Sequence, residues 1–285
     1  MSKLLPNVKR IIAVSSAKGG VGKSTVAANL AMALQLEGYK VGVLDADLYG
    51  PSQPLIFGVS EHRPDIDENG KMTPIMAHGL AVMSIGFHLQ REDSALIWRG
   101  AQLNSALEKL LFDTNWPVLD YLVVDLPPGT GDIQLSLSQQ VVVAGALVVS
   151  TPQELALLDA KKGLKMLHQL NIPVLGVVEN MNMFICPQCG HEEHLFGHDA
   201  AQLMSLQYLV NFLGSLPLDK RIQQGDESGV PFVLAHPDDK ISTIFREMAS
   251  KIVEIVAQNE ADASPVVPQT AEQLQPQIKE IKWNI

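Results

Sequence analysis

A glycine-rich segment near the start of the chain constrains the fold more strongly than any other feature, because it joins an apolar run to a helical pattern. The segment comprises Ser16, Ala17, Lys18, Gly19, Gly20, Val21, Gly22, Lys23, Ser24 and Thr25. Apolar residues 11–14 precede it, and the helical pattern of residues 26–31 follows it. A strand, a glycine turn and a helix start in this order direct backbone N–H groups and the helix dipole at one anion. The sequence therefore predicts a phosphate-binding loop.

Two side chains of this loop are suited to a nucleotide. Lys23 is placed to reach the β- and γ-phosphates, and the Ser24 hydroxyl is placed to hold Mg²⁺. Ala17 stands where the first glycine of the pattern G-x-x-x-x-G-K-[ST] would be, and a second lysine, Lys18, comes directly before the glycines. The alternative is a glycine-rich turn that binds nothing. It is disfavoured because the strand and the helix that the motif requires are both predicted.

Two aspartates, Asp45 and Asp47, stand at the carboxyl end of the next predicted strand, residues 41–45. Ligands of parallel sheets collect at the carboxyl ends of strands, so both carboxylates are expected to point toward the phosphates. One would orient or deprotonate the attacking water, and the other would position the metal or the loop. Without the preceding loop, the same residues are equally typical of aspartates that cap a turn.

A third element of the same kind follows further along the chain. Asp125 ends an apolar run at residues 121–125, where a carboxylate is suited to Mg²⁺ coordination, and a Pro-Pro-Gly turn comes next. Gly129 gives this stiff turn one permissive residue, so it can present a backbone N–H to a γ-phosphate. An ordinary strand-end turn is the alternative, and the order of the three elements argues against it.

The two cysteines, Cys186 and Cys189, form a C-x-x-C pair for which several interpretations stay open. With His191 and His194 they offer a zinc site of two sulfur and two nitrogen ligands, although the histidine spacing is tight. A redox dithiol is a second possibility, but the surrounding sequence does not resemble a thioredoxin unit. An iron–sulfur cluster ordinarily needs four thiolates, which a two-fold dimer supplies if the pair lies on its axis. Two incidental surface cysteines are the remaining alternative.

Composition limits the class of protein. At 285 residues with 46% hydrophobic content, the chain can bury a full α/β core. A net charge of −10 argues against a nucleic-acid-binding surface, and sparing use of cysteine fits a reducing compartment. Residues 1–10 show no secretory or organellar signal, and the longest apolar run, residues 141–149, is too short to span a bilayer. We therefore expect a cytoplasmic enzyme without stable membrane insertion.

Apolar runs alternate with helical patterns, which predicts an α/β fold with a mostly parallel, doubly wound sheet and helices on both faces. Strands are expected at residues 10–15, 41–45, 80–85, 121–125, 146–150, 174–179 and 212–216. Helices are expected at residues 24–37, 95–112, 153–170, 200–208 and 240–258. We expect one domain over residues 1–258, with the C-x-x-C insertion at about 181–198, and a loose tail over residues 259–285. The last eight residues regain an apolar rhythm, so they are expected to dock on the core or a partner, and they are a weak membrane-anchor candidate.

The two-lysine loop resembles the deviant Walker A loop of the SIMIBI class of P-loop ATPases, which includes the nitrogenase iron protein, MinD and ParA. The whole chain resembles the Mrp/ApbC branch of that class over residues 8–258. The resemblance is carried by residues 45–52, Trp98-Arg99-Gly100, residues 125–132, Glu179-Asn180-Met181 and the C-x-x-C pair. Departures are Ala17, Ala101 in place of a usual proline, and a start close to the loop where many members carry a further N-terminal domain.

The resemblance implies a nucleotide-sandwich homodimer in which Lys18 reaches the partner's nucleotide, with Lys18, Lys23 and Asp47 as catalytic residues. ATP would contact residues 17–25, Asp45, Asp125 and Gly129, while Ser24 and Asp47 would hold Mg²⁺. Asn180 matches the asparagine that pairs with the base, and Pro217 and Asp219 match the loop that covers it.

Members of the branch carry a labile cluster, here expected as 4Fe-4S, between the C-x-x-C pairs of two subunits. They take clusters from scaffold proteins and deliver them to apoproteins, with ATP binding or hydrolysis coupled to that role. The rival function is a spatial organiser of the MinD/ParA kind, which would need a basic surface or an amphipathic C-terminal helix.

Overall fold

One mainly parallel sheet forms the centre of the molecule in the computed structural model, which describes residues 5–88 and 100–262. Its parallel strands follow the order β4 (Leu80–Ser84), β2 (Val41–Asp45), β5 (Leu119–Asp125), β1 (Val8–Ser15), β6 (Gly145–Ser150), β7 (Val174–Ile185) and β9 (Phe212–Leu218). Strand β3 (Ile75–Ala77) pairs antiparallel with β4, and β8 (Glu192–Glu193) pairs antiparallel with the end of β7.

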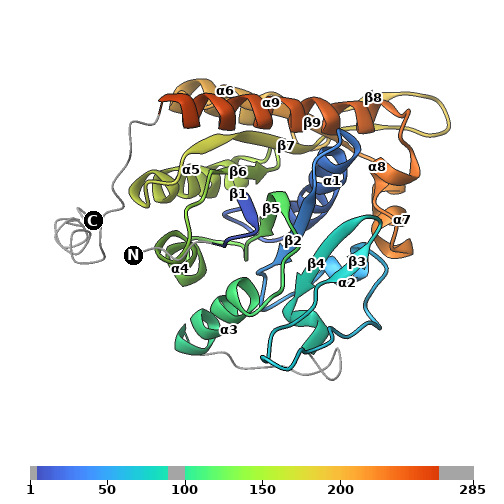
Figure 1. The fold of residues 1–285 in the computed structure, drawn as a ribbon. Helices are drawn as coiled ribbons and strands as arrows, with labels where there is room; N and C mark the ends of the chain where they lie inside the picture. The colour runs from blue at the N-terminus through green and yellow to red at the C-terminus, as the bar shows by residue number, and fades with distance from the viewer. Residues whose placement is uncertain (1–4, 89–99, 263–285) are drawn as a thin grey trace.

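Helices cover both faces of this sheet (Figure 1). On one face α1 (Lys23–Leu36) packs against α8 (Phe232–Ala235) and α9 (Lys240–Asp262). On the other face α5 (Glu154–Gln169) packs against β6 and α6 (Ala200–Tyr208), and α3 (Gly100–Phe112) packs against α4 (Asp132–Gln140). The short α2 (Gln53–Ile56) contacts α7 (Lys220–Ser228), and a 3-10 turn, η1 (Ile85–His88), follows β4.

The burial of the strands explains the architecture. Strands β2, β4 and β6 are buried at every residue. Continuously apolar strands of this kind are stable only where helices cover both faces of a parallel sheet. One hydrophobic cluster includes residues of all the long strands and of α1, α5 and α9. The predicted doubly wound α/β fold is confirmed, and the carboxyl ends of β1, β2 and β5 meet at one edge.

Element boundaries differ from the expectations where pairing or capping extends an element. Strand β7 continues to Ile185 instead of ending at residue 179, because residues 184 and 185 pair with β8. Helix α9 continues to Asp262, where Glu260 bonds Arg10 of β1 through two 2.7 Å contacts. Residues 259–262 of the expected tail are thus helical, and residues 263–285, including the last eight, lie outside the described residues. Residues 95–99 of one expected helix also lie outside them.

Helices α2, α4, α7 and α8 were not expected from the sequence. Each is short, and α7 is strongly polar, with the sequence KRIQQGDES. Its start is set by the Asp219 side chain, which accepts a hydrogen bond from the Arg221 backbone N–H and so caps the helix. A short polar helix that begins at such a cap has no repeating apolar residues, so its sequence shows no helical hydrophobic periodicity.

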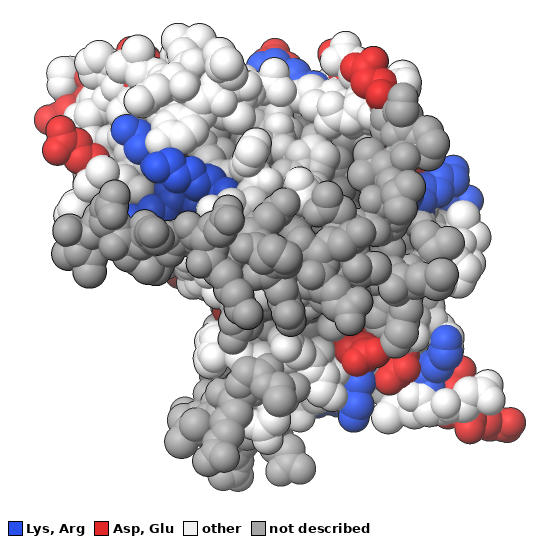
Figure 2. All heavy atoms as spheres, turned by 90° about the vertical axis from the view of Figure 1, so that its left-hand side faces the viewer, with Lys and Arg blue, Asp and Glu red and all other residues white. Residues whose placement is uncertain are grey.

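The surface carries no single dominant field in the view of Figure 2. Lysine and arginine side chains form small groups on this face, and several of them lie directly beside acidic side chains. Across the described residues, no helix combines the length and apolar character that a bilayer crossing requires.

Candidate functional site

The predicted phosphate-binding loop connects β1 to α1 as expected. Gly20 and Gly22 adopt φ angles of 79° and 82°, which favour glycine. Gly22 is the N-cap of α1, so the first N–H groups of this helix are not capped by that residue's side chain. A Cβ atom added at Gly22 would overlap with Nδ2 of Asn180. The loop therefore presents uncapped backbone donors in a backbone path that a larger residue would disturb.

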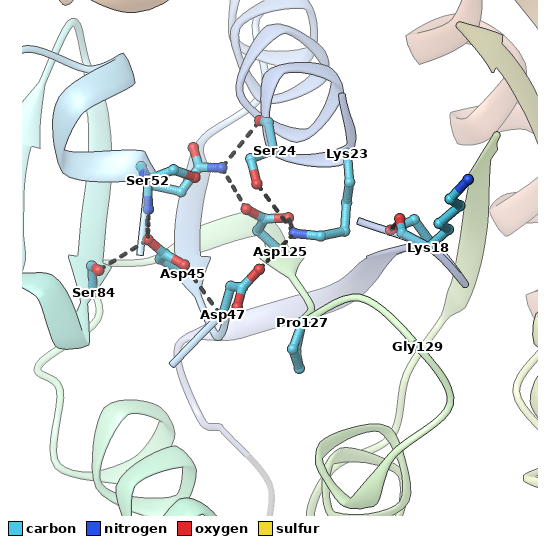
Figure 3. A network of polar contacts seen from close by, with 12 residues as sticks. Lys18, Lys23, Ser24, Asp45, Asp47, Ser52, Ser84, Asp125, Pro127 and Gly129 are labelled. Carbon is cyan, nitrogen blue, oxygen red and sulfur yellow. Dashed lines mark hydrogen bonds and ion pairs between the residues drawn. The ribbon is translucent and has the colours of Figure 1, made fainter. Parts of the chain in front are cut away.

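Four predicted residues meet at the end of this loop (Figure 3). The Lys23 ammonium lies 2.5 Å from Oδ1 of Asp125, 3.5 Å from Oδ2 of Asp47 and 3.1 Å from the Ser24 hydroxyl. Lys23 is 6% exposed and Asp125 is fully buried. Carboxylates thus neutralise the charge of the lysine that is expected to bind phosphate. We call Lys23, Ser24, Asp47 and Asp125 the phosphate-site cluster.

Asp45 organises the loop that carries Asp47. Its carboxylate accepts hydrogen bonds from the backbone N–H groups of Asp47, Ser52 and Gln53 and from the Ser84 hydroxyl, at 3.0 to 3.2 Å. Burial, and then the nearby Asp125 charge, raise the pKa of Asp45 to about 7. Burial also raises the pKa of Asp47. Of the two roles expected for this pair, Asp45 fits the positioning of the loop and Asp47 is the one that faces Lys23.

Gln53 belongs to this site although no sequence pattern indicated it. Its Nε2 donates to Oδ2 of Asp125 at 2.8 Å and to the Ser24 backbone oxygen at 3.1 Å. The side chain is fully buried. No spacing rule connects a glutamine in a four-residue helix with the end of a distant strand. Only the tertiary arrangement identifies it.

Gly129 lies beside the loop, but its N–H is engaged in this structure. It donates to the Ser16 backbone oxygen at 2.8 Å, and the Gln134 amide donates to the carbonyls of Pro127 and Gly129, each at 3.0 Å. Gly129 has a φ of 98°, in the region that favours glycine. Contact between its N–H and a γ-phosphate therefore requires this turn to move.

The residues expected near the base divide into two groups. Asn180, at 7% exposure, donates from Nδ2 to the Val21 backbone oxygen at 2.9 Å, which places it against the loop. Asp219 caps α7 and pairs with Arg221 at 2.6 Å, and this side-chain contact lowers the pKa of Asp219. Its carboxylate is thus occupied by a structural role, and its neighbour Pro217 lies in β9.

The remaining loop residues face outward or toward other helices. Lys18 is exposed and extends away from the phosphate-site cluster in Figure 3. Ala17 approaches α5, since a Cβ added at Gly163 would lie 3.6 Å from the Ala17 Cβ. The Thr25 hydroxyl donates to Oδ2 of Asp226 in α7 at 2.5 Å, so Thr25 ties the start of α1 to that helix.

The two cysteines occupy the tip of the hairpin formed by β7 and β8. The Cys186 N–H donates to the His191 carbonyl at 2.9 Å, which closes the turn, and both thiols are free. Backbone N–H donation, from Gln188 first, lowers the pKa of the Cys186 thiol. Cys189 is exposed. The pair is therefore presented at the surface with thiolate formation favoured.

The four-ligand zinc set is not assembled in this chain. Nδ1 of His194 lies 2.7 Å from the Asn182 carbonyl oxygen, and the His194 ring stacks on His198 with centroids 5.0 Å apart. Among residues 5–88 and 100–262, no three histidine, cysteine, aspartate or glutamate side chains form a group suited to a metal ion. The His194 ring is directed into local contacts with the Asn182 carbonyl and His198.

The comparison with protein families identifies the chain. A ParA family model, described as the NUBPL iron-transfer P-loop NTPase, matches residues 7–253. The chain belongs to the NUBPL iron-transfer P-loop NTPase family. This membership confirms the resemblance found in the sequence, including the SIMIBI-type loop with two lysines.

Relatives of this NTPase include named carriers and nucleotide-binding proteins. The iron-sulfur cluster carrier protein of Haemophilus influenzae is 56% identical over 86% of this chain and 66% of its own length. The chain thus spans just under two thirds of that relative. A nucleotide-binding protein from Archaeoglobus fulgidus, solved with ADP, superposes with a TM-score of 0.69 at 38% identity, over 79% of this chain and 88% of its own.

The fold of the chain is also similar to that of a cell-division ATPase. The MinD protein of Pyrococcus furiosus superposes with a TM-score of 0.65 at 25% identity, over 87% of this chain and 99% of its own. The MinD-like P-loop architecture that the resemblance implied is thereby confirmed.

Proposed function

We propose that this chain binds and hydrolyses Mg·ATP and uses the nucleotide to control an iron–sulfur cluster that it carries to apoproteins. One observation supports the proposal most directly. The phosphate-site cluster lies at the start of α1, after β2 and at the end of β5, and a pair of free thiols at the surface follows β7 of the same sheet. The name of the Haemophilus influenzae relative supports the choice of cargo.

The nucleotide half follows from the charges of the site. ATP phosphates would take Lys23 from Asp125 and Asp47, because a phosphate is an equally strong anionic partner and the loop adds backbone donors. The freed carboxylates and the Ser24 hydroxyl are oxygen ligands of the kind Mg²⁺ prefers, directly or through water. Bound Mg²⁺ would neutralise charge that develops on the transferred phosphoryl group. Asp47 would orient the attacking water, while Gly129 responds to the γ-phosphate.

Lys18 supplies the argument for a nucleotide-bound dimer. It is exposed and directed away from its own phosphate-site cluster. A lysine in this position is suited to contact the nucleotide of a second copy, as the resemblance to two-lysine loops implies. Two copies facing each other across their nucleotides would therefore complete each site, with Lys18 as the residue supplied in trans.

The iron–sulfur cluster part of the proposal is supported by the number of thiols. One chain offers Cys186 and Cys189, whereas a 4Fe-4S cluster is ordinarily held by four thiolates. Two copies related by a two-fold axis would supply the set if the hairpin tips meet. Transfer would exchange the carrier's iron–thiolate bonds for those of acceptor cysteines, with no net oxidation or reduction. Scaffold proteins would load the pair, and exposure of the hairpin would let an acceptor approach it.

The proposal is tested by anaerobic reconstitution with iron and sulfide in the reducing conditions of a cytoplasm. The expected product is brown, with broad visible absorbance. Cys186→Ser or Cys189→Ser should abolish this absorbance, and His194→Ala should preserve it. Incubation with an apo-ferredoxin should move the cluster to it at a rate that depends on nucleotide. Colourless protein with one zinc per chain, lost on His194→Ala, would contradict the carrier role. ATP-dependent sedimentation with liposomes or DNA would instead favour a MinD/ParA-like organiser.

A further inference from the structure

We propose that Gln53 is a positioning residue. Through its hydrogen bond to Asp125, it couples the orientation of that carboxylate to the position of α2 and, through α2, to the position of α7. The inference rests on the nucleotide-binding half of the proposed function. It names a side chain that neither sequence motif nor family membership marks. Gln53 would not touch the nucleotide. It would act through the carboxylate that faces the metal and phosphate.

The contacts of Gln53 define its orientation. Nε2 donates to Oδ2 of Asp125 at 2.8 Å and to the Ser24 backbone oxygen at 3.1 Å. Both partners are acceptors, so the nitrogen and the oxygen of the amide cannot be exchanged. The carbonyl Oε1 is buried and has no hydrogen-bond partner within the described residues. An apolar side chain at this position would avoid the cost of the unsatisfied oxygen. The function of the amide therefore lies in the hydrogen bonds that its nitrogen donates.

The main chain of Gln53 is held as firmly as its side chain. Its backbone N–H donates to Oδ2 of Asp45 at 3.1 Å, and its carbonyl accepts from the Phe57 N–H at 3.0 Å. Gln53 is thus fixed to Asp45 on one side and to Asp125 on the other. Lys23 occupies Oδ1 of Asp125 at 2.5 Å, so both carboxylate oxygens are engaged before nucleotide binds. When phosphate draws Lys23 away, Gln53 is left as the side chain that orients Asp125.

A second contact continues the connection from α2 to α7. Gly58, which follows α2, packs backbone to backbone on Gly229 at the end of α7, and a Cβ atom at Gly229 would overlap with the Gly58 Cα. The Gly229 carbonyl also lies 2.8 Å from Nε2 of His78. Helix α7 begins at Asp219 and bonds Thr25 through Asp226. A shift of α2 therefore reaches the helix that flanks the expected base-covering loop.

The test measures nucleotide affinity with and without Mg²⁺, together with hydrogen exchange of the full chain. Gln53→Met keeps the length of the side chain and removes its donor. We expect it to lose about tenfold or more of the gain in ATP affinity that Mg²⁺ provides, with little change in Mg²⁺-free affinity. Nucleotide-dependent protection of residues 220–229 should also disappear. Gln207→Met, an exposed glutamine of α6, serves as the matched control and should behave as the unmodified chain.

A titratable variant tests the same donor within one folded protein. In Gln53→Glu, a protonated carboxyl can still donate one hydrogen bond to Asp125, whereas an ionised one would face Asp45, Asp47 and Asp125 with Lys23 as the opposing charge. The Mg²⁺-dependent gain should therefore be absent at about pH 8 and partly restored at about pH 6. The unmodified chain, measured at both pH values, corrects for its own carboxyls. This arm carries the test if Gln53→Met does not fold.

The outcomes separate the inference from the function on which it rests. If the unmodified chain binds no nucleotide, the proposed function itself fails. If it binds Mg·ATP, and Gln53→Met retains the full Mg²⁺-dependent gain and the protection of residues 220–229, Gln53 is merely structural. Equal affinity of Gln53→Glu at both pH values, relative to the unmodified chain, would overturn the inference as well.

Discussion

The ammonium nitrogen of Lys23 lies 2.5 Å from Oδ1 of Asp125, so the lysine of the phosphate loop is paired with a buried carboxylate. Both side chains are buried, and a buried charge without a partner is strongly disfavoured. Nucleotide binding would therefore exchange one anionic partner of Lys23 for another. The same exchange would release Asp125 at the moment when a metal-bound phosphate needs it.

Replacement of this lysine tests the exchange. Lys23→Met should abolish ATP binding and destabilise the nucleotide-free protein by about 3–5 kcal/mol at pH 8, since it leaves buried carboxylates without a counter-charge. The loss should shrink toward pH 6, because burial raises the pKa of the neighbouring Asp45 carboxyl to about 7 and its protonation relieves part of the uncompensated charge. Urea unfolding at both pH values gives the free energies of unfolding. Lys162→Met, which breaks an exposed ion pair with Asp159, should cost less than about 1 kcal/mol. Equal effects of the two variants would contradict this account.

The pH dependence of stability has an identifiable source in Asp226. Burial raises the pKa of this carboxyl to about 6, and its Oδ1 has no hydrogen-bond partner within the described residues. The folded state thus holds a proton that the unfolded state releases between about pH 4 and about pH 6, so stability falls as pH rises through that window. Asp226→Asn keeps an acceptor for Thr25 and should raise the free energy of unfolding at pH 8 by about 1–3 kcal/mol.

The control for this measurement is Asp238→Asn, at an exposed position. It should leave the slope of stability against pH unchanged, whereas Asp226→Asn should reduce the slope and leave the contribution of Asp45. A slope that persists unaltered in Asp226→Asn would show that other groups account for it.

Gly22 and Gly38 both have positive φ angles, so substitution at the two sites distinguishes backbone strain from an effect on nucleotide binding. Gly22 and Gly38 have φ angles of 82° and 94°, so alanine at either position costs about 1–2 kcal/mol. At Gly38 a Cβ would meet nothing within 4 Å, whereas at Gly22 it would overlap with the Asn180 amide. We expect Gly22→Ala to lose nucleotide binding and Gly38→Ala to retain it. Calorimetric titration with ATP checks both, and intact binding by Gly22→Ala would remove the loop from the phosphate site.

Lys18 should behave differently from Lys23. Because Lys18 is exposed and points away from the cluster, Lys18→Ala should leave the melting temperature of the nucleotide-free protein unchanged. It should still bind ATP, but the ATP-dependent dimer and its hydrolysis should be lost. Light scattering with ATP, beside a phosphate-release assay, measures both. A variant that hydrolyses ATP as a dimer would contradict the role in trans.

Much of the fold was accessible from the sequence because its signals are local. The strand, glycine turn and helix around Lys23, and the apolar strands that end in Asp45 and Asp125, each carry their own pattern. Their order predicts that all three strand ends meet, and the structure brings Lys23, Asp47 and Asp125 together.

What the sequence missed depends on tertiary contacts. Gln53 reaches Asp125 across 72 positions of chain, and the donor of the Gly129 turn is occupied by Ser16. Asp219 matches a base-loop position, yet Arg221 and the first turn of α7 engage its carboxylate. Such partners are set by how helices pack on the sheet, and no local periodicity encodes that.

The central claim is that one chain holds half of a cluster site. Anaerobic native mass spectrometry of the reconstituted full chain measures this directly. The account predicts a species of two chains plus one 4Fe-4S cluster, which dissociates to cluster-free monomers on Cys186→Ser. A cluster or a zinc ion bound to a single chain, with no two-chain species at any nucleotide state, would contradict it.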